Sequence, residues 1–474
     1  MRVASAVLVV VAVLAPAVSA QPPIQLNTTI RSFTTVSGSP WVADIWSYTD
    51  TLGNDYALVC RGNSGMSMYN INNPAAPFFT SSIALGGGSD MKDVKVYQNY
   101  AFALKQSGGT QIVDLSNPNS IQVVATITGS AHNGFVYENG PGAPLYLQAR
   151  NGANPANLRI YDISNPAAPI YRGAWNPPSG DTHDVYAQDG LAYVNVLFGN
   201  AEGTYIIDIS NPVAPTQVGF VPTGDWSHSC WMYNAPGNQK YLLECNETGD
   251  GHALIYNVTN PAAPTFTSEY RTATSSTISC HNPVIVGKYA YIAWYGDYLR
   301  ILDLSRPSNP IEVGTYDPVP NNAGVGLYDG AWGVAFVREL PNGDRRLLLT
   351  ESFSAIKGFW VIDFTPPPSL DVEMTSTNGD VQIGITHASP FEQIFMGISS
   401  QTGGTLGTGP LAGIGSDGIF TMLSPLGAQP FHVGATAAGT YDFSLPAGAL
   451  PPGLAIDFVH LTFTKVGPCG RLIL

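Results

Sequence analysis

Four histidines occur at equivalent positions of a repeated sequence and could act together as metal ligands. Each is the third residue of the first strand-like segment of its repeat, and the four are His132, His183, His228 and His281. Neutral imidazole is the commonest metal ligand in proteins, and three or four imidazoles suit Zn, Cu, Mn or Fe. If these positions converge in space, the sequence predicts a site for a divalent transition metal, with Zn, Mn and Cu as the first ions to consider. No motif specifies any other cofactor.

Two further roles are open for these histidines. A repeat protein can reuse a residue because it satisfies the same backbone group in every unit, which would make the role structural. The imidazoles could also take part in acid-base chemistry, and the candidate catalytic residues are then His183, His228, Arg61 and Arg150. The spacing of the histidines follows the repeat length and not a local metal-binding motif, so the spacing does not decide between these roles.

Acidic residues accompany the histidines. The position after the aligned one holds Asp44, Asp93 and Asp184, and loops after the second strands hold Glu247 and Glu351. We expect these five carboxyl groups at the same mouth of a central channel as the histidines. Other loop residues predicted on this face are Glu202, Asp250, His252 and Asp297.

The elements that position these residues form a repeat of about 45 residues. Residues 160–169 read IYDISNPAAP, and the seven copies of this element carry their Asp or Asn at positions 70, 114, 162, 208, 257, 303 and 363. Two strand-like runs precede each copy and a fourth run follows it. Four short strands with tight turns are typical of a β-propeller blade, so seven copies predict an all-β, seven-bladed β-propeller.

The two ends of the chain have separate predicted roles. The seventh unit has three strands before Pro366, and the segment 24–35 resembles an outermost strand, so we expect the N-terminal strand to complete the last blade and close the ring over residues 21–365. After a Pro-rich linker at 366–369, residues 370–474 alternate apolar and polar segments between Gly-rich turns. This pattern predicts a small C-terminal β-sandwich domain with strands at residues 381–385, 393–397, 418–422, 441–445 and 456–464.

Composition and the first residues constrain location and partners. Arg2, the apolar run that follows it and the small residues before Gln21 predict a signal peptide over residues 1–20, cleaved after Ala20. No later stretch is long and apolar enough for a transmembrane helix. Twenty Lys and Arg against 34 Asp and Glu give a formal charge of −14, which disfavours nucleic acid. We therefore expect a secreted or cell-envelope monomer with an extracellular protein or glycan as its partner.

The cysteines and aromatic residues carry weaker signals. The five cysteines are Cys60, Cys230, Cys245, Cys280 and Cys469, and none forms a C-x-x-C pair. An exported protein permits a disulfide among Cys230, Cys245 and Cys280, with the pairing left open. The aromatic residues Trp46, Trp226, Trp231, Trp294, Tyr295 and Trp332 favour packing between blades over stacking on sugars.

The repeated strand-Asp-Ile-Ser-Asn-Pro element, with the segments 131–133, 182–184 and 227–230, resembles the LVIVD-repeat propellers over roughly residues 40–365. The resemblance is greatest to the choice-of-anchor B type of secreted bacterial protein, and it implies the propeller fold without an activity. We expect a secreted binding or scaffold protein, and leave enzyme activity uncertain. The alternative, by analogy with oligogalacturonate lyases, is a metal-dependent uronate lyase in which Arg61 or Arg150 binds the sugar carboxylate. A copper redox role is a third possibility.

Overall fold

The computed structural model describes most of the chain between residues 22 and 367 and the strands of the C-terminal region. The described residues are 22–84, 90–152, 155–224, 226–235, 239–273, 277–320, 326–352 and 357–367, followed by 371–375, 381–386, 393–399, 432–435, 441–446, 455–462 and 466–473. The predicted signal peptide lies outside these residues. Among them, no helix is long and apolar enough to cross a membrane.

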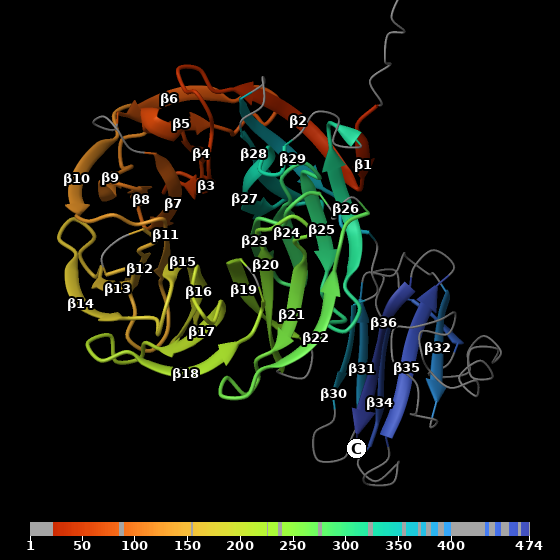
Figure 1. The fold of residues 1–474 in the computed structure, drawn as a ribbon. Helices are drawn as coiled ribbons and strands as arrows, with labels where there is room; N and C mark the ends of the chain where they lie inside the picture. The colour runs from red at the N-terminus through yellow and green to blue at the C-terminus, as the bar shows by residue number, and fades with distance from the viewer. Residues whose placement is uncertain are drawn as a thin grey trace, which may run out of the picture.

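Seven antiparallel sheets follow one another around a central axis and form a seven-bladed β-propeller (Figure 1). This architecture confirms the predicted fold class. The innermost strands are β3 (Ile45–Thr49), β7 (Met91–Tyr97), β11 (Asn133–Tyr137), β15 (Asp181–Gln188), β19 (Ser227–Ala235), β23 (Asn282–Val286) and β27 (Gly330–Glu339). The second strands are β4 (Asp55–Cys60), β8 (Tyr100–Lys105), β12 (Leu145–Ala149), β16 (Leu191–Leu197), β20 (Gln239–Asn246), β24 (Tyr289–Ala293) and β28 (Arg345–Ser352).

The repeated sequence element forms the third strand of each blade and the corner after it. The third strands are β5 (Met66–Asn70), β9 (Gly109–Asp114), β13 (Leu158–Asp162), β17 (Gly203–Asp208), β21 (Ala253–Asn257), β25 (Leu299–Asp303) and β29 (Gly358–Phe364). In the first six blades the Asp or Asn side chain accepts a hydrogen bond from the backbone N–H two residues later, as Asp162 does from Ser164 at 2.8 Å. This bond fixes the turn, and the prolines that follow cannot extend the strand.

The outermost strands show how the ring closes. Six of them are β6 (Phe78–Ile83), β10 (Gln122–Ile127), β14 (Ile170–Trp175), β18 (Thr216–Val221), β22 (Thr265–Tyr270) and β26 (Ile311–Asp317). The seventh is β2 (Thr28–Thr35), which pairs with β29 and confirms closure by the N-terminal segment. In addition, β1 (Ile24–Leu26) pairs with β26, so the same segment joins blades six and seven.

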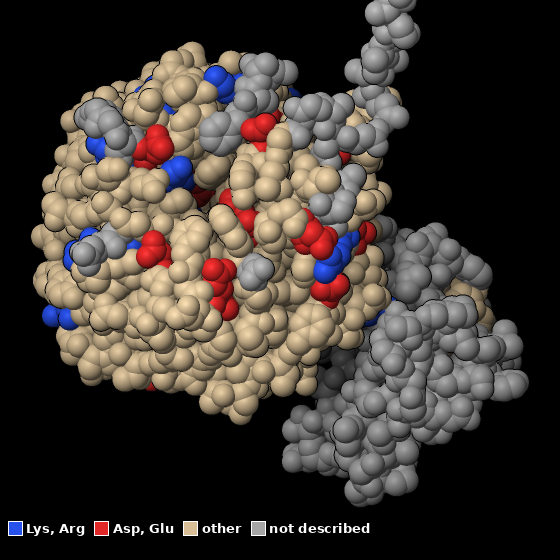
Figure 2. All heavy atoms as spheres, viewed as in Figure 1, with Lys and Arg blue, Asp and Glu red and all other residues tan. Residues whose placement is uncertain are grey.

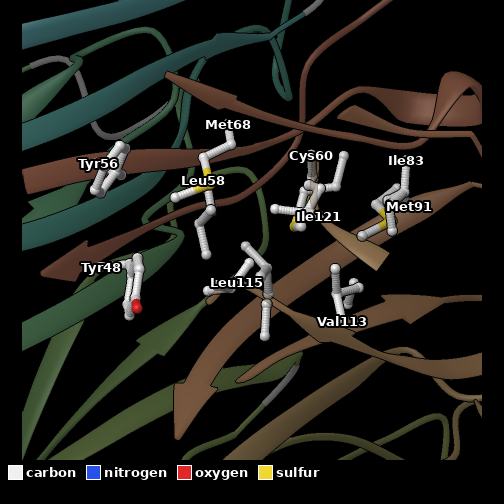
Figure 3. Close-up of a cluster of buried hydrophobic side chains, with 14 of the residues drawn as sticks. Tyr48, Tyr56, Leu58, Cys60, Met68, Ile83, Met91, Val113, Leu115 and Ile121 are labelled. Carbon is white, nitrogen blue, oxygen red and sulfur yellow. The ribbon is translucent and has the colours of Figure 1, made fainter. Parts of the chain in front are cut away.

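The core consists of apolar layers between neighbouring blades. Figure 3 shows the layer between the first two blades, where Leu58, Met68 and Leu115 are buried together. Cys60 lies in this layer as a free thiol, and burial raises its pKa well above the usual value. A thiolate is therefore disfavoured at this position, and Cys60 acts as a small apolar residue.

The described strands of the C-terminal region form two sheets. One contains β30 (Asp371–Thr375), β31 (Val381–Thr386) and β34 (Tyr441–Leu445). The other contains β32 (Gln393–Ser399), β33 (His432–Gly434), β35 (Ala455–Thr462) and β36 (Val466–Ile473). Four of the five strands predicted here coincide with β31, β32, β34 and β35, whereas the fifth, at residues 418–422, lies outside the described residues. The sandwich arrangement and the domain boundaries stay predictions.

Candidate functional site

A bulge in the innermost strands turns two consecutive side chains toward the channel. On β15, Thr182 pairs with Val196 and Asp184 pairs with Asn195, so His183 has no residue opposite it. On β19, His228 occupies the same position between two paired residues. Bulges of this kind re-aim side chains. The bulge on β15 explains why His183 and the next residue, Asp184, both face the channel.

The four aligned histidines converge, as the sequence predicts. The ring centroids of His132 and His183 are 4.1 Å apart, those of His183 and His228 are 4.6 Å apart, and those of His228 and His281 are 4.4 Å apart. Because the aligned position lies at the start of each innermost strand, the imidazoles form an arc at one mouth of the channel. The face of the ring seen in Figure 2 is hollowed at its centre, with acidic side chains around the hollow.

Glu247 lies among the imidazoles. Its Oε2 atom is 3.6 Å from Nε2 of His228, and its Oε1 atom is 3.7 Å from Nε2 of His281. One potential ligand atom from each of His183, His228 and Glu247 lies within 4.8 Å of the other two. A tetrahedral ion with bonds of ~2.1 Å needs ligand atoms ~3.4 Å apart, so small side-chain rotations would suffice for these three groups to reach one ion.

Burial keeps the imidazoles neutral. His183 and His281 are 6% and 2% exposed, and burial together with the neighbouring imidazoles holds their pKa values well below the usual range. Burial lowers the pKa of His132 to about 3, with Lys92 and His228 as smaller causes. Burial also lowers the pKa of His228, although Glu247 opposes this effect. Neutral imidazole is the form that binds metals.

Hydrogen bonds outside the cluster orient two of the rings. His281 donates from Nδ1 to the backbone carbonyl of Trp332 at 2.6 Å, which leaves the Nε2 lone pair toward Glu247. Nδ2 of Asn151 lies 2.7 Å from Nδ1 of His183, whose Nε2 has no hydrogen-bond partner among the described residues. A metal on Nε2 would require the Asn151 amide to turn and accept a hydrogen bond from Nδ1. Such outer contacts commonly fix metal-binding histidines.

Sequence reasoning assigned Tyr295 to packing between blades and missed its contact with the cluster, which it supports from blade six. Its hydroxyl donates to Oε1 of Glu247 at 2.5 Å, and its ring lies 4.5 Å from that of His281. Burial and Glu247 raise the pKa of Tyr295 well above its usual value, so the phenol stays a donor. Tyr295 has a φ of 31°, in the left-handed region. No sequence signal indicated this conformation or this contact.

A disulfide connects the two chain segments that contain Glu247 and His281. Cys245 on β20 and Cys280, just before β23, form the bond. This resolves the pairing that the sequence left open, since Cys230 is a free, buried thiol. Cys245 lies two residues before Glu247, and Cys280 precedes His281. The disulfide therefore ties together two parts of the cluster that belong to different blades.

The predicted arginines are engaged elsewhere. Arg150 donates from Nε to the Ser130 carbonyl at 3.1 Å and from Nη1 to the Pro155 carbonyl at 2.9 Å. Arg61 donates to the Ser64 carbonyl at 3.1 Å. Lys92 is instead the cation close to the cluster. Its Nζ lies 4.8 Å from the ring centroid of Trp41 and 5.4 Å from that of Trp332, and burial lowers its pKa.

The remaining predicted acids occupy different places. Asp44 and Asp93 both accept hydrogen bonds from Lys95, one layer deeper in the channel than the histidines. Asp184 lines the same layer. Glu351 is buried in blade seven next to Tyr298, and burial together with Glu351 raises the pKa of Tyr298. Glu202 accepts hydrogen bonds from the backbone of Phe198 and Trp226. Of the five expected channel-mouth acids, only Glu247 lies within the described histidine cluster.

Comparison with known proteins agrees with the repeat. The LVIVD repeat family matches residues 88–128, 153–176, 179–223 and 282–318. The chain is thus a β-propeller that contains LVIVD repeats. No curated protein matches the sequence. Among solved structures, a putative 6-phosphogluconolactonase from Bacteroides fragilis is 11% identical, with a TM-score of 0.47 over 58% of this chain and 85% of that one. A likeness of this size gives no information on activity.

Proposed function

We propose that this chain is a secreted β-propeller that binds a divalent transition metal at one channel mouth and uses that mouth to hold an extracellular ligand. The observation that carries the proposal is the convergence of His183, His228 and Glu247, whose potential ligand atoms lie within 4.8 Å of one another. Two imidazoles and one carboxylate are a common ligand set for a metal that keeps an open position. The open position would then accept an atom from the ligand.

An acidic glycan is the ligand class that this mouth suits. Lys92 supplies a positive charge, and its long-range electrostatic effects reach His132 and Glu247. Trp332 lies beside both Lys92 and His281, with its ring 4.8 Å from that of His281. A sugar carboxylate could bind the metal and Lys92 while the apolar face of the sugar packs on an aromatic ring.

Metal content is the first test of the proposal. The purified mature protein is incubated with Zn, Mn or Cu, dialysed and analysed by mass spectrometry, beside the double variant His183→Ala/His228→Ala. We expect about one metal per wild-type chain and at least a ten-fold lower content in the variant. His252→Ala is the matched control because His252 lies outside the cluster, where it contacts Glu269. A wild type that takes up none of the three metals contradicts the proposal.

A metal-dependent uronate lyase is the second candidate, and Lys92 favours it. Burial lowers the pKa of this amine, which makes a neutral base more accessible. In a β-elimination, Lys92 would remove the proton beside the sugar carboxylate. The released electron pair would form a C=C bond as the glycosidic C–O bond breaks, and the leaving oxygen would take a proton from water. The metal would stabilise the carboxylate during this step.

The hypothesis that the protein is a uronate lyase is tested by a separate experiment. Polygalacturonate and alginate are incubated with the metal-loaded protein, and unsaturated products are detected by ultraviolet absorbance. A lyase should form such products, and Lys92→Met should lower the rate at least a hundred-fold without loss of metal. Lys105→Met is the control for removing a lysine elsewhere. If wild type binds metal and these glycans but forms no product, the binding function stands and the lyase reading fails.

Secretion requires a separate test, since residues 1–20 are not described. Expression in a bacterial host with export machinery, followed by N-terminal sequencing of protein recovered outside the cytoplasm, should give Gln21 as the first residue. Recovery of the uncleaved chain from the cytoplasm alone would contradict the predicted signal peptide.

A further inference from the structure

The opposite end of the channel contains a second cavity that the histidine cluster does not use. It has a volume of about 310 Å³, within the usual range for small-molecule sites. Val96, Glu138 and Gln188, at the ends of the innermost strands, form its rim, whereas the histidines lie where those strands begin. The cavity therefore opens on the face opposite the metal-binding mouth.

Aromatic rings form much of its wall. Trp46, Phe135 and Trp231 line the cavity, and all three are only partly buried. The ring of Trp231 lies 5.8 Å from that of Phe135 and 4.6 Å from that of Tyr186, so the rings are fixed by mutual packing. In the sequence, Trp46 and Trp231 favoured packing between blades over stacking on a ligand. The structure shows that they also present surface to a space that a small molecule could fill.

A smaller polar chamber of about 40 Å³ lies deeper and shares Trp46, Phe135, Trp231 and Lys95 with the outer cavity. A space of ~10–15 Å³ already holds one water, so the chamber could accept a head group. The chamber wall also includes Asp44, Asn133, Asp184, Ser229 and Asn282.

Several hydrogen-bond donors of the lining residues are used by the protein. Lys95 donates to Asp44 at 3.1 Å and to Asp93. Ser229 donates its hydroxyl to the backbone carbonyl of His281, and Asn282 donates its amide to that of Trp332 at 3.4 Å. These contacts engage the Lys95 ammonium group, the Ser229 hydroxyl and the Asn282 amide.

Asn282 and Asp184, two of the residues that line the chamber, carry hydrogen-bond acceptors. Oδ1 of Asn282 is buried and has no hydrogen-bond partner among the described residues. Asp184 accepts from the backbone N–H of Val185 at 2.6 Å, and no ion pair to it is found within the described part of the chain. A buried acceptor without a donor costs free energy, so a ligand that donates hydrogen bonds would be favoured here.

Among the described residues, carboxyl groups outnumber cations around this chamber. Three carboxyl groups, those of Asp44, Asp93 and Asp184, surround the single ammonium group of Lys95. The Lys95 ammonium also lies 4.6 Å from the ring centroid of Trp46. The protein thus already places one cation against an aromatic face and carboxylates at this depth. A second cation could use the acceptors that Lys95 does not reach.

From this arrangement we infer a second ligand site that binds a small organic amine, with its ammonium group in the polar chamber and its apolar body between Trp46, Phe135 and Trp231. The site is independent of the proposed metal and lies at the other end of the channel. An inorganic cation could use the acceptors but would leave the aromatic cavity empty, so the combined shape favours an alkyl- or arylalkylammonium ion.

The probe is 2-phenylethylammonium, titrated into the full mature chain at pH 8 with tryptophan fluorescence and calorimetry as readouts. The neutral isostere 2-phenylethanol and the anion phenylacetate are matched comparisons. We expect the ammonium ion to bind at least ten-fold more tightly than the alcohol, because a charge-assisted hydrogen bond is worth more than a neutral one. Equal binding of the ammonium ion and the alcohol, or no binding of the ammonium ion, overturns the inference.

Variants locate the site. Asp184→Asn and Trp231→Leu should each weaken ammonium binding about ten-fold, whereas Asp344→Asn and Trp226→Leu, which lie outside the cavity lining, should leave it unchanged. Circular dichroism confirms that each variant is folded. The variant His183→Ala/His228→Ala should retain ammonium binding, which separates this site from the metal site. If folded Asp184→Asn and Trp231→Leu bind as wild type does, the cavity is not the site.

Discussion

Tyr295 donates a hydrogen bond of 2.5 Å to Glu247, a residue 48 positions earlier in the chain and in the preceding blade. The contact holds the Glu247 carboxylate at Oε1, whereas Oε2 is the oxygen near His228. It also places a buried aromatic ring against His281. Two residues that no motif connects therefore determine where the potential ligand atoms of the site point.

Removal of this hydrogen bond should weaken metal binding without loss of the fold. Tyr295→Phe keeps the ring but leaves Glu247 without its donor, so we expect the metal affinity to fall about ten-fold or more, as for other residues that orient ligands. Competition with a chelator measures the affinity. Tyr298→Phe, a neighbouring tyrosine in contact with Glu351, should not change it. An unchanged affinity in Tyr295→Phe would show that Glu247 is not a ligand.

The Cys245–Cys280 disulfide should matter for both stability and the site. It closes a loop of 35 residues, and bonds of this kind commonly contribute about 2–4 kcal/mol to the free energy of unfolding. We expect reductant to lower the denaturation midpoint of wild type and to weaken its metal binding. Reductant should not affect the variant Cys245→Ala/Cys280→Ala. Equal sensitivity of the two proteins would contradict the prediction.

The buried histidines predict a loss of stability in acid for the metal-free protein. Their folded pKa values lie below the unfolded value of ~6.5, so between these values the unfolded chain binds protons that the folded chain does not. The contribution of these histidines to the free energy of unfolding is fully present above pH ~6.5 and is lost as the pH falls below that value. One such group contributes at most ~1.4 kcal/mol per pH unit.

The comparison of wild type with His281→Gln isolates this effect, because buried carboxyl groups such as Glu244 have raised pKa values and titrate with the opposite sign. Urea unfolding at several pH values between 7 and 4, with a chelator present, gives the slopes. His281→Gln should be less pH-dependent than wild type, and His252→Gln should match wild type. Equal slopes for wild type and His281→Gln would mean that His281 is protonated in the folded state.

Closure of the ring depends on Asp363 of β29. This carboxylate is fully buried and pairs with Arg346 at 2.9 Å and with Arg31 of β2 at 2.7 Å. Asp363→Ala leaves Arg346 without its partner, so we expect a loss of about 3–5 kcal/mol in the free energy of unfolding. Arg31 is 40% exposed at its side chain, and Arg31→Ala should cost about 1 kcal/mol or less. Similar losses in both variants, measured by urea denaturation, would contradict this account.

The sequence by itself determined the fold. Its repeat of strand, Asp or Asn and proline specifies local structure in every unit. An Asp or Asn side chain can accept a hydrogen bond from the backbone two residues later, which favours a turn. Proline has no backbone N–H to donate, so it ends the strand. Seven such units, with one strand missing from the last and one available at the N-terminus, leave few topologies other than a closed ring. The alignment of the units also placed His183 and His228 at equivalent positions.

The tertiary structure decided which of these residues meet and what surrounds them. Convergence of the histidines depends on bulges such as the one at His183 and on the closure of the ring, which bring residues from separate blades to one mouth. The contact of Tyr295 with Glu247 and the acceptor-lined chamber beside Asn282 arise between blades. Such contacts depend on the distances between residues of different blades. They cannot be inferred from the residue types of either blade alone.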